Sequence, residues 1–171
     1  MNTYPALTNV RSQLADTFSL LQSRAVRASL LAKLTGKNTR LATFPEQAPQ
    51  KSPNRRFIGV KEICIEEIVG TLNRHSDFDH EFRPLKSYLR DRWINVYLTL
   101  ENEGWSPIIV HQVGDDYYVE DGHHRLSVAR LLGMTYIQAN VWEYPVTEIP
   151  AKKSSPARCP ERSSATVYAA Q

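Results

Sequence analysis

The sequence is poor in cysteine and has no long apolar run, and each absence excludes a class of protein. Only two cysteines occur among 171 residues, Cys64 and Cys159, and their distant positions fit no metal-binding spacing. We therefore expect no disulfide framework and a reducing, cytoplasmic compartment. No stretch approaches the roughly 18 apolar residues that would span a bilayer, so no membrane partner is expected. The N-terminus also lacks the apolar core of a secretory signal.

What is present is ordinary globular composition, with 42% hydrophobic and 23% charged residues, which favours one domain with a buried core. The net charge of +3 hides an asymmetry. Residues 1–56 hold 9 Lys and Arg against 2 Asp and Glu, whereas residues 57–150 hold 8 against 15. Such a basic arm predicts either contact with DNA or packing onto the acidic body of the same chain.

Residues 1–56 are predicted to form a basic N-terminal helix and a Pro-containing linker. Residues 6–35 contain neither Gly nor Pro, and Gly36 supplies a stop signal. The helix presents an apolar stripe with spacings of three and four, made of Leu7, Val10, Leu14, Phe18, Leu21, Ala25, Ala28 and Leu31. This stripe could dock on the body, pair with a second chain in a homodimer, or leave the helix free to bind a polyanion; we expect docking.

Residues 57–147 are predicted to be the folded domain, in the order strand, helix, strand, strand, helix, strand. The first strand starts near Phe57, and a helix with periodic apolar residues runs from Pro84 to Gly104. Residues 108–113 and 117–120 form a hairpin, a helix of about ten residues ends at Gly133, and residues 136–142 form the last strand. The order predicts an α+β fold with a small mixed β-sheet and packed helices. Residues 148–171 are predicted to be a disordered basic tail.

The strongest functional signal is the turn at residues 121–125, Asp-Gly-His-His-Arg, which follows a strand and opens a helix. Amides in the first turn of a helix have no internal partner and lie at the positive end of its dipole, so they favour anions. Glycine lets a ligand approach the backbone, arginine offers a planar set of donors to phosphate, and histidine can donate to phosphate oxygens. The predicted phosphate-binding residues are Gly122, His123, His124 and Arg125.

Glu120, Asp121 and His123 are candidate general bases. A carboxylate or an imidazole near a phosphate can deprotonate an attacking hydroxyl. The simpler interpretation of the same residues is that Asp121 caps the helix, Gly122 only permits the turn and the histidines are solvated.

The turn, its preceding hairpin and the helix that ends in Leu-Gly together resemble the phosphate-binding motif of the ParB/sulfiredoxin-like superfamily. The resemblance covers about residues 57–145. Within the superfamily, the sequence is similar to an uncharacterised prokaryotic group. Further matching positions are Gly70, Arg74, Asp77-Phe78-Asp79, Phe82-Arg83-Pro84, Arg92-Trp93 and Val113-Gly114-Asp115. The resemblance implies the same α+β fold.

Members of this superfamily use the turn for different ligands. ParB proteins of chromosome segregation bind CTP with the motif Gly-Glu-Arg-Arg. In this sequence His123 replaces the Glu, His124 replaces the first Arg, and Arg125 matches the second Arg. Sulfiredoxin binds ATP with Gly-Cys-His-Arg; because His123 replaces its reactive Cys, sulfinic-acid reduction is not expected. Free-serine kinases carry Asp-Gly-His-Thr-Arg, which differs here only at His124. The resemblance implies ATP or CTP as the bound nucleotide, with Mg²⁺ as a further option.

A second polar cluster at residues 73–81 is dense in side chains that titrate or bind metals. Arg74 is predicted to neutralise phosphate charge, and His75 or Asp77 to bind Mg²⁺ through water. The alternative is that Asp77 and Asp79 cap the helix that follows. The run is one histidine short of a dinuclear zinc pattern, so no protein-held metal site is predicted.

The leading hypothesis is a ParB-like nucleotide- and phosphate-binding domain, DNA-associated through its basic N-terminal helix and tail. The alternative is an enzyme that uses the same turn, either a small-molecule phosphotransferase of free-serine-kinase type or a nuclease. Recognition of a partition site in the ParB manner is not expected, because no helix-turn-helix pattern follows the turn.

Overall fold

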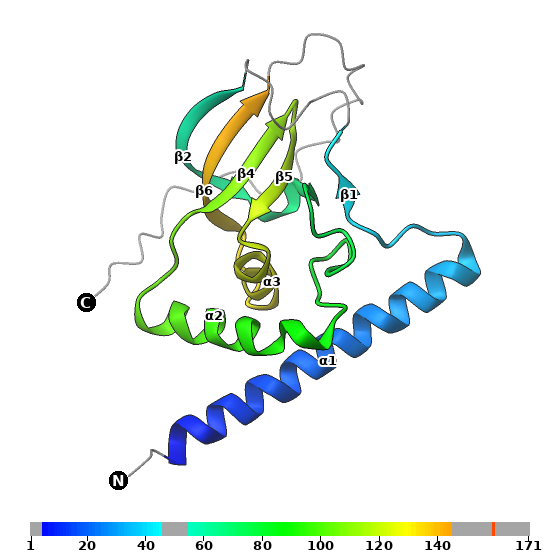
Figure 1. The fold of residues 1–171 in the computed structure, drawn as a ribbon, viewed down its shortest axis with the longest axis vertical. Helices are drawn as coiled ribbons and strands as arrows, with labels where there is room; N and C mark the ends of the chain where they lie inside the picture. The colour runs from blue at the N-terminus through cyan, green and yellow to red at the C-terminus, as the bar shows by residue number, and fades with distance from the viewer. Residues whose placement is uncertain (1–4, 46–54, 145–158, 160–171) are drawn as a thin grey trace.

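The computed structural model describes residues 5–45, 55–144 and Cys159, and it has the predicted α+β architecture (Figure 1). Its sheet is mixed and has six strands in the order β1-β3-β5-β4-β6-β2. The strands are β1 (Ala42–Thr43), β2 (Arg56–Cys64), β3 (Ile68–Thr71), β4 (Ile108–Val113), β5 (Asp116–Asp121) and β6 (Tyr136–Tyr144). The helices are α1 (Pro5–Thr35), α2 (Arg90–Asn102) and α3 (His123–Leu131), with two 3₁₀ turns, η1 (Ile65–Glu67) and η2 (Ser87–Leu89).

The main core lies between the sheet and the helices. Alternate residues of β4 and β5, among them Ile108, Val110 and Val119, are fully buried in it, as period-two alternation requires. Leu126 and Val128 of α3 and Trp93 of α2 complete this core. The predicted hairpin is therefore the support on which α3 and the turn before it are held.

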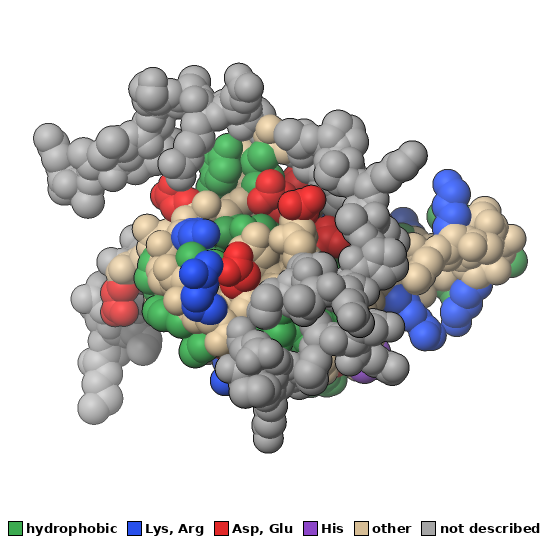
Figure 2. Space-filling model, turned by 90° about the horizontal axis from the view of Figure 1, so that it is seen from above, with side chains coloured by type: hydrophobic (Ala, Val, Ile, Leu, Met, Phe, Trp, Pro, Cys, Tyr) green, Lys and Arg blue, Asp and Glu red, His purple; other side chains and the backbone are tan. Residues whose placement is uncertain are grey.

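Helix α1 docks on the body, as expected, through the N-terminal part of its apolar stripe. Phe18 is buried and meets Trp93 of α2 edge to face, with 5.8 Å between the ring centroids, and Arg11 donates to Asn95 at 2.8 Å. The C-terminal end of α1 projects from the body, and Lys and Arg side chains are visible there, while Asp and Glu side chains gather on the body (Figure 2). Among the described residues, no helix is long and apolar enough to cross a bilayer.

The segment predicted as a linker contributes to the fold before it leaves the described residues at 46. Leu41 and Phe44 are buried, and β1 between them pairs in parallel with β3. Strand β3 in turn pairs in parallel with β5, so it is an interior strand that the predicted order of elements omitted. The predicted disordered tail lies outside the described residues except for Cys159.

The prediction that the cysteines form no disulfide is wrong. Cys64 and Cys159 are bonded, with Cα atoms 6.2 Å apart and a sequence separation of 95. Their distant positions had suggested no pairing, but Cys159 lies at the end of β2 in space. Because disulfides persist in oxidising compartments, the cysteines no longer support a cytoplasmic location.

We expect Cys159→Ser to lower the free energy of unfolding by about 3 kcal/mol, because the bond restricts a long loop of the unfolded chain. Urea denaturation with and without dithiothreitol measures this effect. Dithiothreitol should destabilise the wild-type protein to the same extent and leave Cys159→Ser unchanged. Equal stability of the oxidised wild type and the variant would contradict the prediction.

Candidate functional site

The predicted turn is the junction between β5 and α3, and no side chain caps the first turn of α3. Gly122 is the N-cap residue with φ 106°, a conformation that side chains disfavour. The first turn contains no acidic residue. Asp121 is therefore not the helix cap that the simpler interpretation predicted. The positive end of the helix dipole has no carboxylate cap in this structure.

His124, in this first turn, is buried, and its Nε2 atom has no hydrogen-bond partner. Its ring meets Phe78 edge to face at 5.5 Å between centroids. Burial, followed by the cations Arg92 and Arg74, lowers the pKa of His124 to about 4. The imidazole is thus neutral near pH 7 and lies in a positive electrostatic environment. An unpartnered polar atom in such a place is costly unless a ligand or water meets it.

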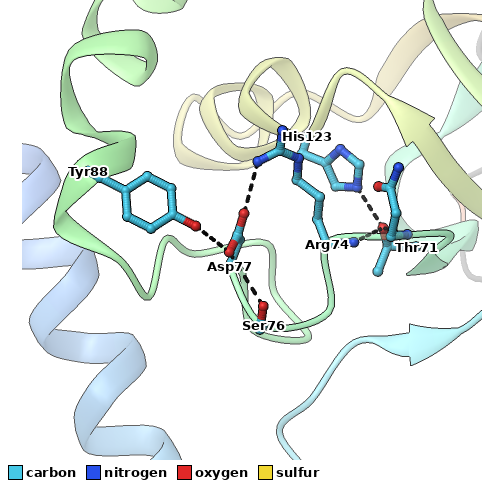
Figure 3. Close-up of polar contacts among 7 residues, drawn as sticks. Thr71, Arg74, Ser76, Asp77, Tyr88 and His123 are labelled. Carbon is cyan, nitrogen blue, oxygen red and sulfur yellow. Dashed lines mark hydrogen bonds and ion pairs between the residues drawn. The ribbon is translucent and has the colours of Figure 1, made fainter.

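His123 is held by the fold instead of facing a substrate. Its Nε2 atom lies 2.6 Å from Oγ1 of the buried Thr71, at the end of β3 (Figure 3). The ring also stacks on Phe78, with centroids 5.8 Å apart. Burial, then Arg74 and His124, lowers the pKa of His123 to about 4. Since Nε2 is already bonded to Thr71, the role of general base predicted for His123 has little support from this geometry.

Arg74 lies beside His123 on the loop that follows β3, as the sequence predicted for a phosphate-neutralising residue (Figure 3). The hydroxyl of Thr71 accepts the Arg74 amide at 3.2 Å, which fixes the start of this loop. The Arg74 guanidinium donates to Asp77 Oδ2 at 2.9 Å, and Tyr88 donates to Asp77 Oδ1 at 2.6 Å. Burial opposes ionisation of Asp77, but these hydrogen bonds outweigh it and keep its pKa below the usual value.

Arg125 does not point its guanidinium at the open turn. Its Nη1 donates to the carbonyl oxygens of Ser106 and Pro107 at 2.6 and 3.1 Å, and Nη2 pairs with Asp121 at 2.6 Å. These contacts clamp the segment before β4 onto α3. In the structure Arg125 and Asp121 therefore pair with each other. The sequence had suggested that Arg125 binds phosphate and that Asp121 acts as a general base.

Glu120 lies on the opposite face of the sheet from the turn. Because side chains alternate along β5, Glu120 points away from the face on which Asp121 meets Arg125. Its carboxylate accepts a hydrogen bond from Nε2 of the buried His111 at 2.6 Å, and Nδ1 of His111 lies 3.0 Å from the Tyr144 hydroxyl. Burial lowers the pKa of His111, although Glu120 acts in the opposite direction. Glu120 is therefore not brought together with the predicted phosphate site.

The structure adds Thr71, Tyr88 and Arg92 to the residues found by sequence. Thr71 and Tyr88 position His123 and Asp77, and Arg92 acts on His124 through its charge. Thr71 was missed because β3 was missed, whereas Arg92 belongs to the positions that carry the superfamily resemblance. Within the described ranges, no three His, Cys, Asp or Glu side chains gather as a metal site would require.

Comparison with known proteins finds structural similarity over half of the chain. No protein-family model matches the sequence, and no curated protein matches it. Among solved structures, sulfiredoxin from Arabidopsis thaliana is similar, with a TM-score of 0.39 and 22% sequence identity. The match covers 50% of this chain and 85% of the sulfiredoxin chain. The functional argument below therefore rests on the geometry of the site.

Proposed function

We propose that the first turn of α3 binds a phosphate group and that the ligand is a nucleotide. The observation that carries the proposal is the buried Nε2 of His124, which has no partner and lies beside a helix N-terminus without a capping side chain. An imidazole N–H at Nε2 and the first amides of α3 would both donate to phosphate oxygens. The ligand would thereby satisfy a polar atom that is otherwise buried alone.

The charges around the turn favour a group with more than one negative charge. Arg74 and Arg92 both lower the pKa of His124, so both act on the same small region. Arg74 forms an ion pair with Asp77, but the Arg74 side chain is 41% exposed and so remains accessible to a ligand. A polyphosphate would engage these cations better than a single phosphate. The resemblance of the turn to the ATP motif at Gly122 and His124, and to the CTP motif at Gly122, favours ATP or CTP as the nucleotide.

The geometry supports binding more than catalysis. The three predicted bases are engaged elsewhere: Glu120 with His111, Asp121 with Arg125, and His123 with Thr71. Asp77, the carboxylate that was predicted to hold Mg²⁺, already accepts from Arg74 and Tyr88. Mg²⁺ would therefore be coordinated by the phosphates of the nucleotide, as is usual for this ion, and not by Asp77.

We expect Arg74→Ala and His124→Ala each to weaken nucleotide binding by about tenfold, the usual effect of losing a hydrogen bond to a charged group. Isothermal titration with ATP, CTP and GTP, with and without Mg²⁺, measures the affinity. Inorganic phosphate should bind more weakly than the triphosphates, and adenosine and cytidine should not bind.

Arg56→Ala is a matched control, because Arg56 is also an exposed arginine in an ion pair, with Glu143 at 2.8 Å, but lies on β2 away from the turn. Its affinity should equal that of the wild type. Binding of nucleosides without phosphate, or equal losses in all three variants, would overturn the proposal. So would the absence of any titration heat or thermal shift with phosphate and every triphosphate.

The DNA partner predicted from the basic N-terminal region stays a prediction. In the described part of that region, Arg24, Arg27 and Lys33 are exposed on α1. Their exposure would allow contact with a polyanion. Homodimer formation through the same helix is likewise still a prediction.

A further inference from the structure

A cavity of about 630 Å³ lies toward the other end of α3 from the phosphate site. Ser127, Arg130 and Leu131 of α3 line it, together with Leu21 and Arg24 of α1 and the disulfide between Cys64 and Cys159. The volume is typical of pockets that hold small molecules. Leu21, Leu131 and Met134 give the cavity an apolar part that suits a short carbon chain.

Two arginines give this cavity a preference for anions. Arg130 donates through Nη2 to the Ile65 carbonyl at 3.0 Å, but its Nε is buried without a partner. Glu66 lies 3.7 Å from Arg130 Nη1, beyond hydrogen-bond distance. Arg24 is exposed on α1 and lines the same space. Guanidinium donors of this kind match the geometry of a carboxylate.

Three arginines, Arg24, Arg83 and Arg130, line the cavity with two carboxylates, those of Glu66 and Glu81, so one positive charge is in excess. Glu81 is paired with Arg83 at 2.9 Å, and Arg83 is also bonded to Asp79. This ion-pair group is therefore satisfied within itself. Arg130 is engaged by the Ile65 carbonyl through Nη2 and by Glu66 through Nη1, so the donors that stay available in the wall are its Nε and the guanidinium of Arg24.

The same wall contains the Cys64–Cys159 disulfide. Because the sequence has two cysteines, the chain can form one internal disulfide. Cys64 is buried and Cys159 is partly exposed. A thiol anchored by its carboxylate on the arginines would have its sulfur inside the cavity that both cysteines line. Arginine side chains near the sulfur atoms would also favour the thiolate, which is the reactive form.

We propose that this cavity binds a small thiol that carries a carboxylate, and that the bound thiol exchanges with the Cys64–Cys159 disulfide. The thiolate sulfur of the ligand attacks one sulfur of the bond and forms a mixed disulfide with it. The other cysteine leaves as a thiolate and takes up the proton that the ligand thiol lost. A second thiol then attacks the mixed disulfide, so that two ligand molecules are oxidised to their disulfide and both cysteines are reduced.

The experiment compares three thiols of similar size and different charge: mercaptoacetate, 2-mercaptoethanol and cysteamine. The rate of opening of the disulfide is followed by alkylation and intact mass. Each rate is divided by the rate of the same thiol with a small neutral disulfide, which removes differences in intrinsic reactivity. We expect mercaptoacetate to have the highest normalised rate and cysteamine the lowest.

Arg24→Ala should reduce the advantage of mercaptoacetate over cysteamine by about fivefold, because it removes a positive charge from the partly exposed wall. Arg130→Ala should reduce it as well, with folding checked by circular dichroism. Arg27→Ala is the matched control, because Arg27 is exposed on the same helix and does not line the cavity.

Retention of the wild-type advantage in Arg24→Ala would overturn the proposal, and so would an equal loss in Arg27→Ala. Equal normalised rates for the three thiols would have the same meaning. Detection of two free cysteine thiols in protein purified under air would also overturn the proposal, because no disulfide would then be present for a thiol to attack. Because these readouts do not involve nucleotide, they stand or fall separately from the proposed phosphate site.

Discussion

Replacing Gly122 by alanine is expected to destabilise the protein by about 4 kcal/mol, because two penalties coincide at this residue. Gly122 has a φ of 106°, which a residue with a Cβ rarely adopts. A Cβ there would also overlap with Cγ2 of Ile108, a fully buried residue of β4. Neither α3 nor the strand can move away without disturbing the core between them. Urea denaturation measures the change.

Gly59→Ala separates the two penalties. Gly59 has a similar φ of 113°, but a Cβ there would meet no atom within 4 Å. The variant should therefore show the backbone penalty alone, about 1–2 kcal/mol. If Gly122→Ala costs no more than Gly59→Ala, then Ile108 does not press on the turn as the structure indicates. Because the first amides of α3 depend on this packing, Gly122→Ala should also weaken nucleotide binding.

The hairpin and the turn could be predicted from sequence because their signals are local. The apolar run of β4, the Gly114-Asp115-Asp116 turn and the glycine before α3 each specify backbone geometry within a few residues. Helix α1 was predicted within one residue because no Gly or Pro interrupts its period. Elements of this kind need little tertiary information.

The features that sequence missed depend on contacts between distant segments. Helix α2 begins at Arg90 and not near Pro84, because the residues before it are held in the loop: Leu85 donates its amide to the Asp77 carbonyl, and Pro84 forms a bridge with Phe78. Strand β3 has only four residues and takes its partners from β1 and β5.

The role of Arg125 shows the same limitation at the candidate site. Its position in the motif indicated a phosphate ligand, but its donors are taken by the carbonyls of Ser106 and Pro107, which are 19 and 18 residues away in sequence. By contrast, the environment of His124 depends on the fold and strengthens the motif, because only the structure shows its Nε2 buried without a partner. Sequence thus identified the turn, and structure decided which of its side chains are available.

Acid should destabilise the protein between about pH 6.5 and pH 4, well before most carboxylates are protonated. His123 and His124 have pKa values of about 4 in the folded state, because both are buried and lie near Arg74. In the unfolded chain a histidine has a pKa of about 6.5. As the pH falls below 6.5 the unfolded chain gains protons first, so unfolding becomes more favourable until the folded state also binds them near pH 4. The contribution of the two neutral histidines to stability is therefore fully present above about pH 6.5.

The two histidines together should remove on the order of 7 kcal/mol across this window, since each shift of one pKa unit corresponds to about 1.4 kcal/mol. Urea denaturation at half-unit intervals from pH 7 to pH 4 gives the slope of stability against pH. His124→Gln removes one of the two titrating groups, so its slope should be clearly shallower whatever its stability at pH 7. His111, whose pKa is also lowered by burial, accounts for part of the slope that remains. An identical slope in His124→Gln and the wild type would mean that His124 is not buried as a neutral group, and the partnerless Nε2 on which phosphate binding was proposed would lose its basis.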